Sequence, residues 1–179
     1  MFFCQIQYFV FEAKLKQLLF RETFMRVGEY CNRDVVVING NESVKNAAQL
    51  MRSYHVGDLV LLEEQENKKI PIGIVTDRDL VFEVMAAGIT PDTLLVRDLL
   101  TEPISCVFEN DSLFQALEVM HSKKIRRLPV INEDRSLVGI ITLDDFIEIL
   151  NETIFKMVDV VKLQQKKEEK QRTRHFKQY

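Results

Sequence analysis

The sequence predicts a mixed α/β fold (α+β) in which two tandem β-α-β-β-α repeats pack as a pseudo-symmetric pair. The main evidence is internal similarity at fixed offsets. Six positions recur 69 residues later: Asn41, Ser43, Ala47, Met51, Ser53 and Leu59 as Asn110, Ser112, Ala116, Met120, Ser122 and Leu128. Four more recur 66 residues later: Gly73, Ile74, Thr76 and Asp79 as Gly139, Ile140, Thr142 and Asp145. We attribute the shorter second offset to a longer hairpin loop in the first repeat, EEQENKK against NEDRS.

Each repeat should open with a buried strand and a helix. The apolar runs at residues 35–38 and 104–107 are too short for a helix and rich in β-branched residues, which favours strands. Apolar residues then recur three and four positions apart, the pattern of a helix with one buried face. The residues expected on that face are Ala47, Leu50, Met51 and Tyr54 in the first repeat, and Leu113, Leu117 and Met120 in the second.

Each repeat should close with a hairpin and a second helix. Apolar runs separated by polar loops predict the hairpins. Their residues are 59–62 with 72–75, and 128–131 with 138–141. The last helix follows Thr76 in the first repeat, with Gly88 as its expected C-cap, and follows Thr142 in the second. Repeats of about sixty residues have marginal cores, so the two should pack against each other.

These elements divide the chain into four parts. They are an N-terminal extension expected to be helical (1–24), the first repeat (25–90), the second repeat (91–158) and a charged C-terminal tail (159–179). The opening residues are apolar, but Glu12, Lys14 and Lys16 interrupt them and no cleavage site follows, so neither a signal peptide nor a membrane span is expected. Met25 is an alternative start.

Charge is spread unevenly along the chain. The net charge is −3; seven basic and two acidic residues give the segment from Lys162 onward +5, which leaves −8 for the rest. Such a tail could bind nucleic acid or lipid, but a solvated or disordered helix end is the favoured interpretation. The cysteines Cys4, Cys31 and Cys106 lack CxxC spacing, so no zinc site or disulfide framework is indicated, and a cytoplasmic location fits.

Both hairpins lead into one motif, GIVTDRD at 73–79 and GIITLDD at 139–145. With IRRLPVIN at 125–132, these motifs resemble the CBS domain family over about residues 27–155. The resemblance implies a non-catalytic regulatory homodimer that binds an adenine nucleotide (AMP, ADP, ATP or NAD) in the cleft between its repeats. It also implies that the motif aspartate accepts both ribose hydroxyls and that the Ser/Thr hydroxyl meets phosphate at the helix N-terminus.

The same Thr-x-x-Asp motif has a purely structural interpretation. Threonine at the start of a helix and aspartate three residues later form a capping box worth about 1 kcal/mol. The two roles are compatible, so the motif alone does not decide between capping and ligand binding.

A first site is expected where the first motif faces the second repeat. Its candidate residues are Thr76, Asp79, Ile74, Thr101, Ile104, Ser105, Ile125, Arg126 and Arg127. The two arginines offer planar, permanently charged groups for phosphate oxygens. Adenine should lie among the isoleucines, with strand backbone groups reading its edge, although each isoleucine could equally be ordinary core.

A second, weaker site is expected at the other motif. Its candidate residues are Thr142, Asp145, Asn32, Val35, Val56, Gly57 and Asp58. Gly57 and Asp58 occupy the positions of Arg126 and Arg127, and an aspartate there would repel phosphate. The sequence therefore predicts one phosphate-competent site per chain, with the second site empty or occupied by a weakly charged ligand.

Catalysis is not expected, because the sequence has no glycine-rich phosphate loop, nucleophile elbow or Cys/His set. No catalytic cofactor or resident metal is predicted, though magnesium could accompany ATP. Regulation would act on a separate, unidentified protein. The alternative is a ligand-free dimerisation or scaffold module whose basic tail recruits a partner. Apolar residues at helical spacing continue past the second repeat and should pack on something such as a second subunit: Ile147, Leu150, Ile154, Val158 and Val161.

Overall fold

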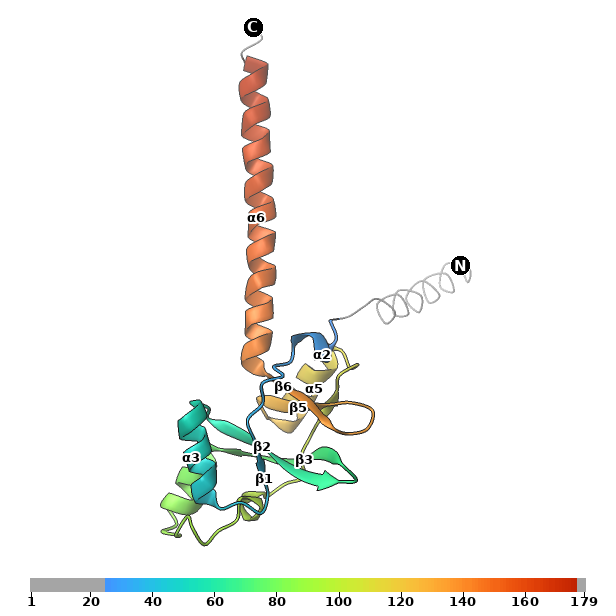
Figure 1. Ribbon diagram of the computed structural model, residues 1–179. Helices are drawn as coiled ribbons and strands as arrows, with labels where there is room; N and C mark the ends of the chain where they lie inside the picture. Colours follow the sequence, from blue (N-terminus) through green and yellow to red (C-terminus); the bar gives the residue numbers. More distant parts are fainter. Residues whose placement is uncertain (1–24, 177–179) are drawn as a thin grey trace, which may run out of the picture. The chain divides into compact units, whose positions relative to one another are not determined.

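The computed structural model describes residues 25–176, and side-chain surroundings as far as residue 170. It forms two compact units, a body that ends at Ile141 and a C-terminal unit that begins at Thr142 (Figure 1). Each unit is considered by itself. The expected N-terminal helix over residues 1–24 lies outside the described residues.

The first repeat contains a three-stranded sheet in the order β1-β2-β3 (Figure 1). Its strands are β1 (Val37–Asn39), β2 (Asp58–Gln65) and β3 (Lys68–Thr76). The helix α3 (Val44–Tyr54) connects β1 to β2, which run parallel, while β2 and β3 form an antiparallel hairpin. The chain then continues through α4 (Asp77–Asp79) into a π-helix, η1 (Leu80–Met85).

The second repeat follows the same order. Its sheet is β4-β5-β6, with β4 parallel to β5. The elements are β4 (Val107–Phe108), α5 (Leu113–Lys123), β5 (Arg127–Ile131), β6 (Leu137–Thr142) and α6 (Leu143–Phe176). The mixed fold of two repeats that the sequence predicts is confirmed.

Two details differ from the sequence-based expectation. The three extra residues of the first hairpin lengthen its strands instead of its loop, because Glu66 and Asn67 both adopt positive φ (50° and 65°) and turn the chain within two residues. The prediction that Tyr54 and Leu117 face the core is wrong, since they are 61% and 37% exposed. Tyr54 is the last residue of α3, and Leu117 lies at the edge of the buried stripe of α5.

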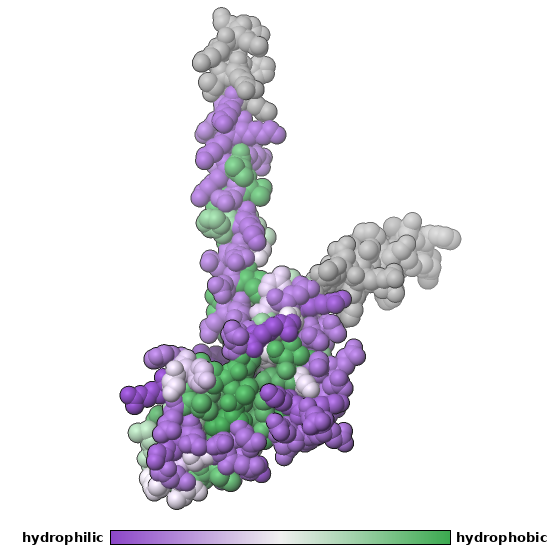
Figure 2. All heavy atoms as spheres, viewed as in Figure 1, coloured by the Kyte–Doolittle hydropathy of each residue, from purple (hydrophilic) through white to green (hydrophobic). Residues whose placement is uncertain are grey.

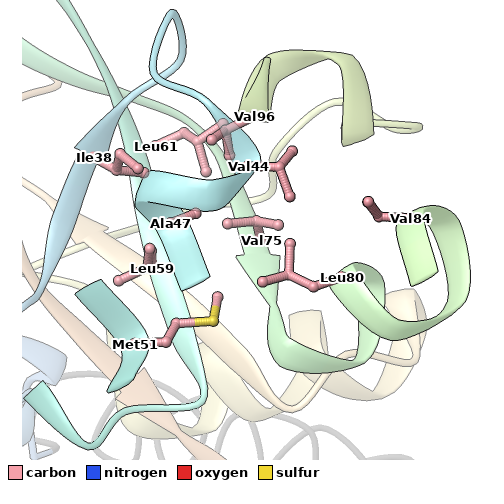
Figure 3. Packing of buried hydrophobic residues seen from close by; sticks show 10 residues of the cluster. All are labelled: Ile38, Val44, Ala47, Met51, Leu59, Leu61, Val75, Leu80, Val84 and Val96. Atoms are coloured by element: carbon pink, nitrogen blue, oxygen red, sulfur yellow. The ribbon is translucent and has the colours of Figure 1, made fainter. Parts of the chain in front are cut away.

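The core of the first repeat gathers apolar side chains from every element of that repeat. Figure 3 shows Ala47 and Met51 of α3 beside Leu59 of β2, with Leu80 and Val84 of η1 nearby. The other face of β2 is also buried: Val60 and Leu62 pack with Ile140 of β6. The strand β2 therefore lies between the helices of its own repeat and the second repeat, which explains its unbroken apolar run.

Two further short helices exchange places between the repeats. They are α2 (Val27–Tyr30), which precedes the first repeat, and η2 (Val96–Leu99, 3-10), which precedes the second. Backbone bonds link the α2 segment to the second repeat, with Val27 N–H donating to Asp111 O (2.9 Å) and Gly28 N–H to Glu109 O (2.9 Å).

The η2 segment makes the equivalent bonds to the first repeat. Val96 N–H donates to Glu42 O (2.9 Å) and Arg97 N–H to Gly40 O (3.1 Å). Donors and acceptors are both displaced by the repeat offset of 69 residues, so the exchange is reciprocal. Each repeat is completed by a segment from beside the other.

The C-terminal unit is dominated by α6, a helix of 34 residues. Within residues 25–176, no helix combines the length and the apolar character that a membrane crossing needs.

Candidate functional site

The first motif lies where β3 passes into α4. Thr76 N–H and Thr76 Oγ1–H both donate to Asp79 Oδ2, at 2.8 Å each. Asp79 N–H donates back to Thr76 Oγ1 (3.3 Å), which completes a capping box. Both side chains are half-buried.

The second motif, at the start of α6, has the same geometry. Thr142 N–H and Thr142 Oγ1–H donate to Asp145 Oδ2 at 2.7 and 2.8 Å. Asp145 N–H lies 3.4 Å from Thr142 Oγ1. The capping interpretation is therefore confirmed for both motifs, and any difference between the two sites must come from what surrounds them.

An ion pair joins the two repeats next to the first motif. Arg127 Nη1 lies 2.5 Å from Asp58 Oδ1, and the two side chains are only 27% and 24% exposed. Asp58 is the register partner of Thr76 in the β2–β3 hairpin, so Arg127 is brought close to the first motif. Because the two residues occupy equivalent positions in their repeats, the pair lies across the pseudo-twofold relation. It joins residues that the sequence assigned to different sites.

The backbone of Ile74 is open on the outer edge of β3. Val60 N–H donates to Val36 O (3.1 Å), on the side of β2 that faces β1. In a strand, the N–H and C=O of one residue point to the same side, so the facing residues Val60 and Ile74 form a non-hydrogen-bonded pair. The N–H and C=O of Ile74 therefore point away from β2, and within residues 25–176 neither has a backbone partner.

The equivalent edge of β6 is closed. Asn32 N–H donates to Ile140 O and Ile140 N–H donates to Asn32 O, at 2.9 Å each. The residues equivalent to this pair, Thr101 and Ile74, form no such bridge in the described part of the chain. The two repeats thus differ at the backbone positions where a flat ligand edge would bind.

Close packing holds the segment before each first strand against the hairpin of the other repeat. A Cβ at Gly73 would lie 2.3 Å from Leu100 Cδ2, and one at Gly139 would lie 2.6 Å from Asn32 O. Leu100 directly precedes Thr101, so this contact brings the segment leading to Ile104 towards the first motif.

The remaining first-site candidates surround this edge in different degrees of exposure. Thr101 and Arg126 are exposed, whereas Ile104, Ser105 and Ile125 are half-buried. Arg126 is adjacent to Arg127 in the chain, and no described contact ties it to the first motif.

The second-site candidates are not brought together in the same way. Val35 and Val56 pack against hydrophobic core clusters, and Gly57 O accepts a hydrogen bond from Asp77 N–H (2.9 Å) beside the first motif. Thr142 and Asp145 belong to the C-terminal unit, whereas the five residues expected opposite them belong to the body.

Two observations bear on thiol and metal chemistry. Burial raises the pKa of the Cys106 thiol from 9.0 to about 11, so this thiol stays protonated and weakly nucleophilic at neutral pH. Within the described residues, no three His, Cys, Asp or Glu side chains gather where they could hold a metal ion.

Two reciprocally completed β-α-β-β units, each with a Thr-x-x-Asp cap after its hairpin, define a tandem-repeat module with the ligand-site candidates at the junction of the repeats. The family model for the CBS domain matches residues 27–86 and 96–152. This chain belongs to the CBS domain family.

Relatives share both sequence and fold with this chain. Hypoxic response protein 1 of Mycobacterium tuberculosis is 36% identical over 121 residues, which are 68% of this chain and 82% of that protein. A solved structure of Hypoxic Response Protein I, with two coordinated zinc ions, superposes with a TM-score of 0.61 at 33% identity, covering 69% of this chain and 98% of that one.

A second solved structure contains a nucleotide. It is a CBS domain protein from Pyrobaculum aerophilum in complex with AMP, 26% identical, with a TM-score of 0.60 over 68% of this chain and 89% of that one. A Methanopyrus kandleri protein of unassigned function is 36% identical over 123 residues, which are 69% of this chain and 61% of that protein.

Proposed function

We propose that this chain is a regulatory module that binds one adenine nucleotide at its first motif and transmits occupancy to a separate protein. The observation that carries the proposal is the open backbone edge at Ile74, next to Thr76 and Asp79, in contrast to the closed edge at Ile140. An N–H donor and a C=O acceptor on one side of a strand complement N1 and the N6 amino group of adenine.

The first motif supplies groups for the sugar. Both capping bonds to Asp79 end on Oδ2, which makes Oδ1 the oxygen that would receive the ribose hydroxyls. Binding would therefore use the cap without dismantling it, so the structural and ligand roles of Asp79 are compatible.

The arginines supply the charge for phosphate. Arg126 is exposed, whereas Arg127 is held by Asp58. Arg127 would have to share its guanidinium between Asp58 and phosphate, or turn from one to the other. Exchange of this inter-repeat ion pair for a phosphate contact is a direct way for occupancy to alter the junction of the repeats.

The relatives support the ligand class. The Pyrobaculum aerophilum protein contains AMP, and part of an inosine-5'-monophosphate dehydrogenase of Methanocaldococcus jannaschii is 28% identical over 123 residues, which are 23% of that enzyme. The CBS match covers no catalytic domain, which fits a non-enzymatic regulator, cytoplasmic as the cysteine usage predicts. ADP, ATP and NAD share the adenosine part, and magnesium would come with ATP.

The decisive test compares the two motifs. We expect Asp79→Asn to weaken AMP or ATP binding about 10- to 100-fold by calorimetry, because one charged acceptor is lost from the ribose contact. Asp145→Asn is the matched control, since it changes the same capping box at the other motif and should leave nucleotide affinity unchanged.

Equal affinity for the wild type and the Asp79 variant would refute the assignment of the first motif. Equal losses in both variants would refute the prediction that the second site is empty or weak. A thermal-shift screen of AMP, ADP, ATP, NAD and S-adenosylmethionine on the wild type then identifies the ligand.

The second candidate function is a ligand-free scaffold, and exposed apolar side chains favour it. On η1, Val81, Phe82 and Met85 are 49%, 56% and 72% exposed. We propose that such helix surfaces pair two copies of the chain. A related CBS-containing protein from bloom-forming cyanobacteria is hexameric, at 28% identity and a TM-score of 0.62. No thermal shift with any adenosyl ligand would favour the scaffold over the sensor.

A further inference from the structure

The helix α6 continues well beyond the CBS match, which ends at residue 152. Between Ile147 and Leu163 its large apolar side chains are exposed, and Figure 2 shows apolar patches interrupting its polar surface. The principal residues of this stripe are Ile147, Leu150, Ile154, Met157, Val158 and Val161, each between 43% and 63% exposed. A stable solvated helix does not normally present such a stripe to water.

The stripe follows a heptad repeat. Counting a positions from Ile147, the β-branched residues Ile147, Ile154 and Val161 stand at a. Leu143, Leu150 and Met157 stand at d. Ile or Val at a with Leu at d is the pattern of a two-stranded coiled coil, and Gln164 at the next d position marks its end.

We propose that a second copy of this chain covers the stripe, with the two α6 helices antiparallel. In an antiparallel coiled coil, a positions face d positions. One register pairs every member of the heptad set: Leu143 with Val161, Ile147 with Met157, and Leu150 with Ile154 of the second copy. Each contact occurs twice by symmetry, which gives six apolar layers without a polar residue.

Charge favours a second copy of this same helix and sets its direction. Residues 143–160 carry five acidic and one basic side chain, a net −4, whereas residues 161–176 carry six basic and two acidic side chains, a net +4. Parallel helices would place the two +4 segments side by side directly after the last apolar layer. Antiparallel helices separate them and direct each basic segment towards the acidic half of its partner.

Cysteine crosslinking of the full-length chain tests both the occupant and the direction. The double variant Ile147→Cys/Met157→Cys should form an intermolecular disulfide between positions 147 and 157 under mild oxidation, identified by peptide mapping. The same two positions within one helix are about 15 Å apart, beyond disulfide reach. Each single variant should fail to crosslink to itself. Glu148→Cys/Met157→Cys, with one cysteine on the polar face, is the matched control and should give no 148–157 link.

Three outcomes would overturn the proposal. Disulfides joining 147 to 147 and 157 to 157 would show parallel helices. A disulfide to Cys4 would show that the N-terminal residues occupy the stripe. The absence of any disulfide at the new cysteines would show that α6 has no α6 partner.

Solution mass measurement provides an independent readout on the same chain. Ile154→Lys should raise the dimer dissociation constant by at least about a hundredfold, because each dimer would bury two Ile154 side chains. Glu148→Lys adds the same charge on the polar face and should change it little. Circular dichroism verifies that both variants remain helical. Equal dimer stability in the two variants would contradict the proposal, which does not depend on nucleotide binding.

Discussion

The two repeats have the same strands and the same capping boxes, yet they differ at one edge. In the second repeat, Asn32 closes the outer edge of β6 through two backbone hydrogen bonds to Ile140. In the first, the backbone groups of Ile74 have no backbone partner within residues 25–176. Duplication has therefore preserved the fold while leaving a potential ligand edge in one copy only.

The largest expected effect concerns the glycine beside each edge. A Cβ at Gly139 would meet the backbone oxygen of Asn32 at 2.6 Å, whereas one at Gly73 would meet the end of the Leu100 side chain. We expect Gly139→Ala to lower the free energy of unfolding by about 2–3 kcal/mol and Gly73→Ala by about 1 kcal/mol, because a leucine can rotate and a bridged backbone cannot. Urea denaturation measures both. Equal losses would show that the two edges are equally rigid.

Hydrogen exchange reports the edges without mutation. The Ile140 amide is bonded to Asn32, so it should exchange at least about tenfold more slowly than the Ile74 amide, as followed by NMR. Addition of a binding nucleotide should slow exchange at Ile74 and leave Ile140 unchanged. Slow exchange at both amides in the free protein would mean that the first edge is also closed.

The smallest effect concerns the Asp58–Arg127 ion pair. A double-mutant cycle with Asp58→Asn and Arg127→Met should give a coupling of about 0.5–1 kcal/mol in unfolding free energy, decreasing with salt. The affinity of the Asp58→Asn variant for AMP should rise severalfold, because Arg127 is released for phosphate. Unchanged or weaker AMP binding in this variant would remove Arg127 from the proposed site.

The sequence predicted the repeats because their offsets are carried by side chains. Buried positions such as Ala47 and Ala116 recur with their helices, and each Thr-x-x-Asp motif specifies a local cap whose partners lie three residues apart. Periodicity failed at Tyr54 because a helix pattern gives the direction of a side chain and not the point at which the sheet ends.

The contacts that distinguish the two repeats could not be predicted in the same way. The Asn32–Ile140 bridge consists of backbone groups, which every residue carries. The offset of 69 identifies Asp58 and Arg127 as equivalent positions, but equivalence does not reveal that they touch. Only the way in which the repeats pack determines that contact.

The reciprocal exchange of α2 and η2 has a consequence for how such a chain could arise. A single repeat expressed alone would present an edge at Gly40–Val44 or Glu109–Leu113 without the segment that completes it. Two identical copies would satisfy each other by the same exchange, as in a domain-swapped dimer. Gene duplication and fusion would then replace a concentration-dependent assembly with a single chain. Once the halves are encoded separately within that chain, one edge can close while the other stays open.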